Sequence, residues 1–239
     1  MIVLLIMGGC KMTNIAIDGP AGAGKSTIAK KVAKALSFSY VDTGAMYRAM
    51  ALYLYRNGIA ADDADKIAAA CGGAAISIEY RDGEQVVLLG EENVNPYLRT
   101  QEVSAMASRS SAVPQVRTRL VQLQQELAAS QNVVMDGRDI GTVVLPDARV
   151  KIYLTASVEV RAKRRFLELT EKGEAAVLEE IAAEIADRDH RDMTREVSPL
   201  KQAEDAVLVD TSDMTIDEVT QRILDIVKEK TGFVQALNN

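Results

Sequence analysis

Several features that would identify other classes of protein are missing from this 239-residue sequence. It holds two cysteines, Cys10 and Cys71, and no CxxC pair, so it predicts neither a zinc site nor a disulfide framework and favours a reducing, cytoplasmic environment. Positive charge is also scarce, because 28 Lys and Arg against 34 Asp and Glu give a net charge of −6. That sign excludes a protein that coats nucleic acid or anionic lipid without specificity. Any phosphate that the chain binds must meet a local cluster of cations.

An apolar run long enough to cross a membrane is missing too. The apolar start, residues 1–7, has no basic residue and is far shorter than the roughly 20 residues that a spanning helix needs, so we do not interpret it as a signal. Because Met12 stands just before the first convincing strand, we expect residues 1–12 to be an extension or the product of a misplaced start codon. With 48% hydrophobic and 26% charged residues, the composition predicts a soluble globular protein without a membrane or nucleic-acid partner.

Strands alternate with helices along most of the chain. The predicted strands are short apolar runs at residues 13–17, 38–41, 132–135, 150–154 and 206–209. The predicted helices are residues 26–36, 44–57, 113–127 and 216–230. This alternation predicts an α/β fold with a doubly wound parallel sheet.

Two segments break the alternation. Residues 75–89 predict an antiparallel hairpin around the turn Asp82-Gly83, which would form a small inserted sheet. Residues 158–195 are almost entirely helical in pattern and rich in arginine, and Gly173 interrupts the pattern. We interpret this second segment as a mobile flap that carries arginines.

The strongest motif is a glycine-rich loop. Residues 19–26, Gly-Pro-Ala-Gly-Ala-Gly-Lys-Ser, match the Walker A pattern G-x-x-x-x-G-K-[ST] between a predicted strand and a predicted helix. Such glycines let successive N–H groups point at phosphate oxygens, and the helix start adds a positive dipole end. Lys25 is then expected to reach the β- and γ-phosphates, and the hydroxyl of Ser26 to ligate Mg²⁺. The loop predicts a site for a nucleoside triphosphate.

The loop alone leaves the fate of the γ-phosphate open. A regulatory GTPase would need an Asn-Lys-x-Asp segment, and the sequence contains no Asn-Lys pair. A nucleic-acid motor would be larger and would need a basic track, which the net charge opposes. A small kinase needs a second anion site, and Arg48, Arg138 and the arginines of residues 188–195 occur where the chain returns to the open end of the sheet.

Five motifs stand in order along the chain: residues 19–27, 42–48 (Asp-Thr-Gly-Ala-Met-Tyr-Arg), 99–103, 136–144 (Asp-Gly-Arg-Asp-Ile-Gly-Thr-Val-Val) and 188–192 (Arg-Asp-His-Arg-Asp). Together they resemble the bacterial cytidylate kinases, over about residues 13 to 230. The resemblance implies one domain, residues 13–239, with a P-loop kinase core (13–58, 99–157 and 196–230), an NMP-binding insert (59–98) and a helical lid (158–195). It also implies a cytoplasmic monomer that uses Mg²⁺ and transfers the γ-phosphoryl group of ATP to CMP or dCMP in pyrimidine nucleotide metabolism.

The same resemblance implies roles for single residues. ATP would be bound by Gly19, Pro20, Ala21, Gly22, Ala23, Gly24, Lys25, Ser26, Thr27 and Arg161. CMP would be bound by Thr43, Arg48, Ser108, Arg117, Arg138, Asp139, Arg188, Asp192 and Arg195; the family usually has Ser at the place of Thr43, and the hydroxyl is kept. Within this set Arg48, Arg138 and Arg195 would hold the phosphate, and Ser108, Arg117 and Asp139 would read cytosine. The residues that act on the transferred group would be Lys25, Arg188 and Arg191.

Some alternatives stay open at this point. Asp136 and Asp42 both end strand patterns, and we prefer Asp136, with Ser26, as the support for Mg²⁺. A carboxylate at Asp139 suits cytosine, because it accepts from an exocyclic amine but would face a carbonyl of uracil. A kinase for another monophosphate is the first alternative, and the pair Asp139 and Arg117 disfavours UMP. A nucleotide-binding regulator that has lost transfer is the second, and the second group of arginines argues against it.

Overall fold

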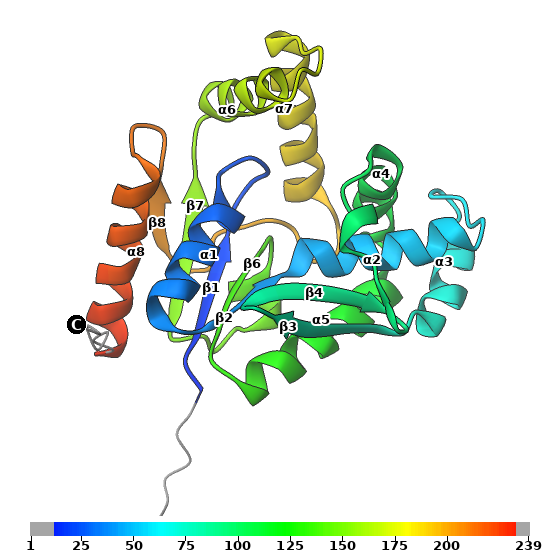
Figure 1. The fold of residues 1–239 in the computed structure, drawn as a ribbon, viewed down its shortest axis with the longest axis horizontal. Helices are drawn as coiled ribbons and strands as arrows, with labels where there is room; N and C mark the ends of the chain where they lie inside the picture. Colours follow the sequence, from blue (N-terminus) through cyan, green and yellow to red (C-terminus); the bar gives the residue numbers. More distant parts are fainter. Residues whose placement is uncertain (1–11, 233–239) are drawn as a thin grey trace, which may run out of the picture.

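The centre of the molecule is a five-stranded parallel sheet (Figure 1). The structure is a computed structural model, which describes residues 12–232. Its order is β2-β6-β1-β7-β8, with β1 (Asn14–Asp18), β2 (Ser39–Asp42), β6 (Val133–Gly137), β7 (Val150–Thr155) and β8 (Val207–Asp210). All five predicted strands are present, with small differences at their ends. The extension expected at residues 1–12 lies outside the described residues except for Met12.

The strand register brings carboxylates to one edge of this sheet. Asp136 of β6 stands beside Asp42 of β2 on one side and beside Ile17 of β1 on the other, and Asp18 is the next residue of β1. In open parallel sheets, ligands bind beyond the carboxyl ends of the strands, where successive loops converge. This edge is therefore where a ligand site is expected.

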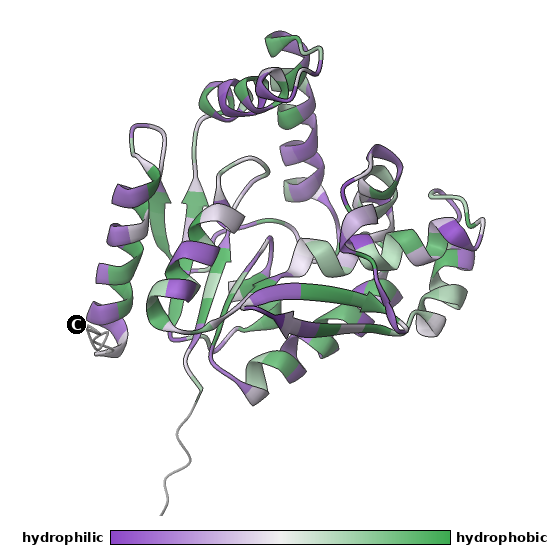
Figure 2. Ribbon diagram, in the orientation of Figure 1, coloured by the Kyte–Doolittle hydropathy of each residue, from purple (hydrophilic) through white to green (hydrophobic). Residues whose placement is uncertain are grey.

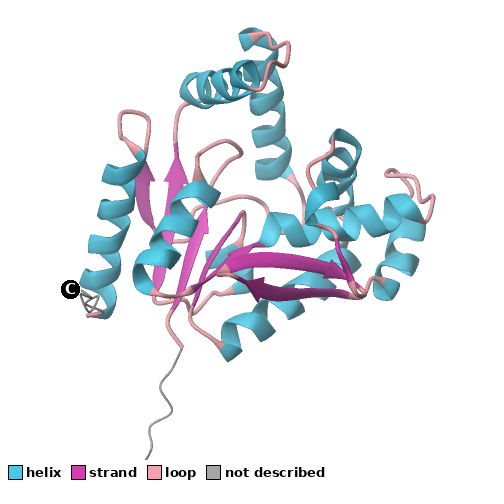
Figure 3. Cartoon of the chain, in the orientation of Figure 1, coloured by secondary structure: helices cyan, strands magenta, loops and turns pink. Residues whose placement is uncertain are grey.

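Helices cover both faces of the sheet, as expected of a doubly wound fold (Figures 1 and 3). Along β1, Ile15 and Ile17 face one cluster, and Ala16 between them faces the other. The first cluster is closed by α1 (Lys25–Leu36) and α8 (Ile216–Thr231), and the second by α2 (Thr43–Arg56), α3 (Ala64–Ala70), α4 (Gln101–Ser110) and α5 (Pro114–Ser130). Within the described part of the chain, no helix is both long and apolar enough to cross a membrane.

The predicted hairpin is present as part of a three-stranded antiparallel sheet, whose strands run across those of the main sheet (Figure 3). It consists of β3 (Ile76–Arg81), β4 (Glu84–Leu89) and the two-residue β5 (Glu92–Asn93), which the sequence did not predict. Asp82 and Gly83 both have positive φ, 53° and 79°, as the tight two-residue turn of a hairpin requires.

The predicted arginine-rich flap is a pair of packed helices, α6 (Val158–Glu171) and α7 (Leu178–Thr194), joined through Gly173 with φ 74°. They project from the main sheet (Figure 1), and α7 is largely hydrophilic (Figure 2). The buried residues of these two helices are few, namely Arg161, Ala162, Ile181 and Asp189. So little buried apolar surface is typical of segments that open at low free-energy cost.

Gly19, where the chain leaves β1, provides a test of the fold. Its φ is +150°, and a Cβ there would lie 1.9 Å from the carbonyl oxygen of Leu154 in β7. We expect Gly19→Ala to reduce the free energy of unfolding by about 2–6 kcal/mol, from backbone strain and from the clash. The matched control is Gly58→Ala, which has φ +67° but nothing within 4 Å, so it should cost only about 1–2 kcal/mol. Urea unfolding followed by circular dichroism measures both, and equal costs would contradict the clash.

Candidate active site

The glycine-rich loop joins β1 to α1 and leaves the start of α1 open to an anion. Gly24 caps the helix with φ 84° and has no side chain to bond the first N–H groups. These groups, together with the helix dipole, form a ready anion site. Lys25, the first residue of α1, is buried, and its Nζ donates to the carbonyl of Pro20 at 2.7 Å. Burial, with the charge of Arg138, lowers the pKa of Lys25 to about 7. A buried cation of this kind is poised to receive phosphate charge.

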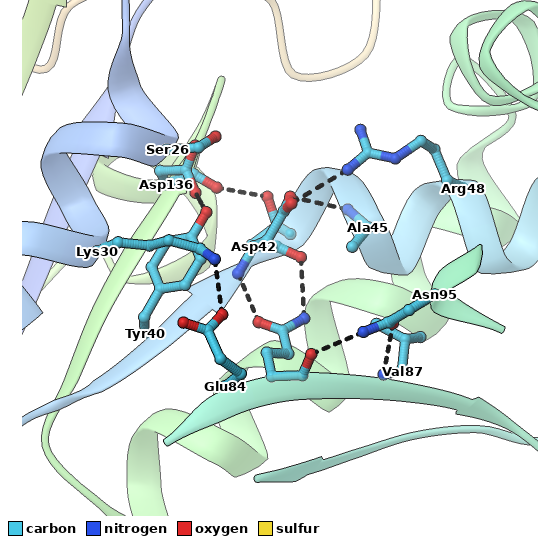
Figure 4. Close-up of polar contacts among 12 residues, drawn as sticks. Ser26, Lys30, Tyr40, Asp42, Ala45, Arg48, Glu84, Val87, Asn95 and Asp136 are labelled. Carbon is cyan, nitrogen blue, oxygen red and sulfur yellow. Dashed lines mark hydrogen bonds and ion pairs between the residues drawn. The ribbon is translucent and has the colours of Figure 1, made fainter. Parts of the chain in front are cut away.

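Asp136, at the end of β6, is the centre of a polar cluster beside this loop (Figure 4). Its Oδ2 accepts from the hydroxyl of Ser26 at 3.0 Å, and its Oδ1 accepts from the hydroxyl of Tyr40 at 2.8 Å. Burial and the neighbouring Asp42 raise the pKa of Asp136 to about 6. A carboxylate beside a hydroxyl supplies the hard oxygen ligands that Mg²⁺ prefers, so these two residues fit the predicted metal role. Asp42 instead directs its carboxylate to α2.

Asp42 organises the start of α2. Its Oδ1 accepts from the backbone N–H of Ala45 at 2.8 Å, which caps the helix, and its Oδ2 accepts from Arg48 at 3.1 Å (Figure 4). The next residue, Thr43, is buried, and its hydroxyl donates to the carbonyl of Asp136 at 2.7 Å. Strand β6 and helix α2 are thereby joined at the edge where Arg48 stands.

A second buried ion pair joins α5 to the segment after β6. Arg117 and Asp139 are hydrogen-bonded to each other, and both are almost fully buried. The guanidinium of Arg117 lies 5.5 Å from the ring centroid of Tyr47. The Nε of Arg117 and the hydroxyl of Tyr47 are buried and find no partner among the described residues. Buried donors without a partner are rare in folded proteins, so a bound water or a polar ligand is expected to satisfy these two. No hydrogen bond among described residues joins Ser108, exposed on α4, to this pair.

Helix α7 and the residue that follows it bring charged side chains toward the same edge. Arg138 donates to Asp192 of α7 at 2.8 Å, and Arg195 lies 3.9 Å from the same carboxylate. Arg188 stands one helical turn before Asp192 on α7. The side chain of Arg188 is exposed, but the protein around it and the charge of Arg138 lower its pKa. Arg191 is also exposed. The structure thus groups Arg138, Arg188, Asp192 and Arg195.

Arg161 is buried and paired with protein groups, unlike a cation that is free to bind a ligand. It is 4% exposed, and its three nitrogens contact the carbonyl of Ala156 (2.9 Å), the carbonyl of Ala21 (2.9 Å) and the carboxylate of Asp189 (2.6 Å). It therefore bridges the glycine-rich loop to helix α7. These contacts hold the glycine-rich loop in place, and the role of ATP ligand that the sequence predicts for Arg161 stays a prediction.

Other residues of the site were not singled out from the sequence. Asp18, at the end of β1, is buried and accepts from the backbone N–H groups of Ile140 and Gly141 at 2.8 and 2.7 Å, which fixes the segment after Asp139. Burial raises the pKa of Asp18 to about 6. Tyr47 and Asp189 stand next to Arg48 and Arg188 in motifs quoted above. This neighbourhood was the signal in the sequence that could have pointed to them. Tyr40 had no signal beyond its place in a strand.

Comparison with known proteins gives a consistent result. The model of the family described as cytidylate kinase matches residues 15–229. The cytidylate kinase of Caldicellulosiruptor saccharolyticus is 50% identical over 222 residues, which cover 93% of this chain and 98% of the relative. That of Carboxydothermus hydrogenoformans is 50% identical over 220 residues, 92% of this chain and 99% of the relative. Among solved structures, an uncharacterized protein from Eubacterium ventriosum has a similar fold, with a TM-score of 0.52 at 13% identity, over 92% of this chain and 99% of that one.

Proposed function

We propose that the edge of the sheet described above is the active site of this chain, which belongs to the cytidylate kinase family. The reaction is transfer of the γ-phosphoryl group of ATP to CMP or dCMP. The observation that carries the proposal is the meeting of two anion sites. Lys25 of the glycine-rich loop lies close enough to Arg138, which follows β6, and to Arg188 of α7 for their charges to lower its pKa. Two substrates that both carry phosphate repel each other, so an enzyme that joins them must supply positive charge on both sides.

On the donor side, residues 19–27 bind the phosphates of ATP. The backbone N–H groups of the loop and of the first turn of α1 point at phosphate oxygens, and Lys25 supplies the charge at the β- and γ-phosphates. Arg161 supports the loop from behind through the carbonyl of Ala21. The ATP-binding set is thus Gly19, Pro20, Ala21, Gly22, Ala23, Gly24, Lys25, Ser26 and Thr27, with Arg161 in a positioning role.

On the acceptor side, three arginines hold the 5′-phosphate of CMP, since a planar guanidinium binds phosphate in a bidentate manner. They are Arg48, Arg138 and Arg195. Arg188 and Asp192 contact the sugar hydroxyls, and Thr43 orders the start of α2. The buried pair Arg117 and Asp139 reads cytosine, together with Ser108. The unpartnered Nε of Arg117 supports this assignment, because a base with a carbonyl and a ring nitrogen would satisfy it.

Mg²⁺ is the cofactor that we assign to Ser26 and Asp136. Their oxygens fit a hard cation, and among described residues no cluster of three or more His, Cys, Asp or Glu could hold a metal ion. A site with so few protein ligands is typical of Mg²⁺ that is held largely by nucleotide phosphates and water. When bound there, Mg²⁺ would neutralise charge on the β- and γ-phosphates.

The transfer needs no covalent intermediate on the protein. An oxygen of the CMP phosphate attacks the γ-phosphorus of ATP. At the same time the bond from that phosphorus to the oxygen that bridges the β- and γ-phosphorus atoms breaks, and ADP leaves with the electron pair. Lys25 holds the transferred group from the loop side. Arg188 and Arg191 approach from the lid and neutralise charge as the group moves. Closure of the lid over both substrates excludes water, which would otherwise hydrolyse ATP.

The same proposal covers the organisation of the chain. The core consists of residues 13–58, 99–157 and 196–230, the insert of residues 59–98 and the lid of residues 158–195. Since all the groups named above come from one chain, we propose that the protein acts as a monomer, in the cytoplasm where ATP and CMP are available. Light scattering on a size-exclusion column measures the first point, and the mass of a dimer would contradict it.

ADP production from Mg·ATP tests the proposed site, with CMP, dCMP, UMP, AMP or no acceptor in parallel reactions. We expect turnover with CMP and dCMP, and a kcat/KM for UMP lower by about 10²-fold or more, because uracil would leave the buried pair unsatisfied. Without an acceptor we expect almost no ADP, because Arg188 and Arg191 reach the transferred group only when the lid closes over both substrates. Comparable turnover with UMP would contradict the assignment of Arg117 and Asp139, and rapid hydrolysis without an acceptor would contradict the need for closure over both substrates.

A further inference from the structure

Strand β2 lies at one end of the main sheet, so one of its edges has no strand partner. Along such an edge the backbone groups of alternate residues lack ladder hydrogen bonds. Here the insert supplies them from side chains. The hydroxyl of Tyr80 donates to the carbonyl of Tyr40 at 3.0 Å, and two residues further along β2 the amide of Gln85 contacts the backbone of Asp42.

The contact between Gln85 and Asp42 is two-sided. The Oε1 of Gln85 accepts from the N–H of Asp42 at 2.7 Å, and its Nε2 donates to the carbonyl of Asp42 at 3.3 Å. One side-chain amide therefore replaces a neighbouring strand at this residue. Gln85 is itself anchored, because the Nδ2 of Asn95 donates to its carbonyl at 2.9 Å while the Oδ1 of Asn95 accepts from the N–H of Val87 at 3.0 Å.

The residue that Gln85 holds is the one that positions Arg48. With both backbone groups of Asp42 fixed, its carboxylate is directed at the N–H of Ala45 and at the guanidinium of Arg48 (Figure 4). The Nε of Arg48 is buried and has no partner among the described residues. Arg48 is thus held through Asp42 and retains a donor for a ligand.

We propose that Gln85 of the insert is a positioning residue for the acceptor phosphate, acting through Asp42 on Arg48. The contacts run from Asn95 through Gln85 and Asp42 to Arg48, so the insert sets the geometry of the phosphate site from outside the main sheet. This inference rests on the proposed role of Arg48 in binding the phosphate of CMP.

The variant Gln85→Met tests it, because Met has a similar length and no amide. We expect the KM for CMP to rise about tenfold, whereas kcat and the KM for ATP stay within about twofold, since only the placement of the acceptor is changed. The matched control is Glu84→Gln, on the same strand, which removes an exposed ion pair with Lys30 and leaves the network intact. It should change none of the three parameters. An unchanged KM for CMP in Gln85→Met, or an equal rise in the KM for ATP, would overturn the inference.

A double-mutant cycle separates this inference from the role of Arg48. Arg48→Ala should raise the KM for CMP, and adding Gln85→Met to it should raise that KM no further, because Gln85 acts through Arg48. If Arg48→Ala leaves the KM for CMP unchanged, the proposed role of Arg48 fails. If Arg48→Ala raises it and Gln85→Met alone does not, Gln85 has no positioning role and Arg48 keeps its own. A further rise in the double variant would show that Gln85 does not act through Arg48.

A second variant distinguishes the positioning role of Gln85 from a general loss of stability. Asn95→Ala loosens Gln85 from the insert side without changing the amide that contacts Asp42. We expect a smaller rise in the KM for CMP, again with the KM for ATP unchanged. Melting temperatures of all variants accompany the kinetics, and a KM for CMP that follows the melting temperature across Glu84→Gln, Asn95→Ala and Gln85→Met would overturn the positioning role.

Discussion

Lys25→Met is expected to lower kcat by about 10³-fold, the effect of removing one well-placed charge from a phosphoryl-transfer site. In the structure Lys25 is buried in the glycine-rich loop, and its Nζ is held at 2.7 Å from the carbonyl of Pro20. Lys30 and Lys31 of the same helix do not replace it, because both are exposed and paired with Glu84 and Asp217. Steady-state ADP production at saturating ATP and CMP measures the effect. A kcat within tenfold of the original would contradict the role of Lys25.

The same variant should remain folded. In the original protein Lys25 makes stability depend on pH, and the sign of this dependence follows from its pKa. The pKa of Lys25 in the folded protein, about 7, lies below the ordinary value of 10.5. Below pH 7 the folded protein contains a buried charge, so stability at this position rises as the pH increases from 7 toward 10.5. Lys25→Met should therefore be more stable than the original protein at pH 7, with a smaller advantage at pH 9. Lys31→Met, an exposed control on the same helix, should change neither kcat nor this pH dependence.

Asp139→Asn is expected to lower the kcat/KM ratio of CMP to UMP by about 10²-fold or more. A carboxylate at this position accepts from the amine of cytosine, whereas the amide of Asn offers donors to the carbonyl of uracil. The change also leaves Arg117 as a buried charge without its partner. A broken buried pair costs about 3–5 kcal/mol of folding free energy, so activity must be measured beside stability.

The companion variant is the double change Asp139→Asn with Arg117→Met. Removing both charges should recover much of the stability that Asp139→Asn alone loses, since no uncompensated charge remains. It should not recover the preference for CMP, because the base-reading groups are gone. If the double variant regained both stability and selectivity, the pair would be structural only. Urea unfolding and kcat/KM for CMP and UMP on the three proteins make the comparison.

The parts of this molecule that the sequence predicts well are those set by local pattern. The glycine-rich loop, the turn at Asp82-Gly83 and the break at Gly173 each depend on residues within a few positions of one another, and the strands follow from short apolar runs. The short strand β5 has only two residues, which is too few for a periodic signal.

Contacts between distant segments could not be predicted in the same way. Tyr40 and Asp136 are 96 positions apart, and Arg161 and Ala21 are 140 apart. A residue's partner at such a separation depends on the order of the strands, which the pattern of apolar residues does not contain. For this reason the sequence indicated Arg161 as an ATP ligand and gave no sign that it joins the loop to Asp189 of the lid.

The order of the strands also decides when the catalytic edge can form during translation. Strands β1 and β2 are made first, with the glycine-rich loop between them, but they do not touch in the sheet, because β6 lies between them. The ribosome must add the whole insert, α4 and α5 before β6 emerges, and long-range parallel pairing of this kind is slow to form. Until then the apolar residues of β1 and β2 have no sheet partner, and the nascent chain exposes surface that a chaperone would bind. The arrival of β6 therefore converts an aggregation-prone intermediate into a chain that can begin to close its active site.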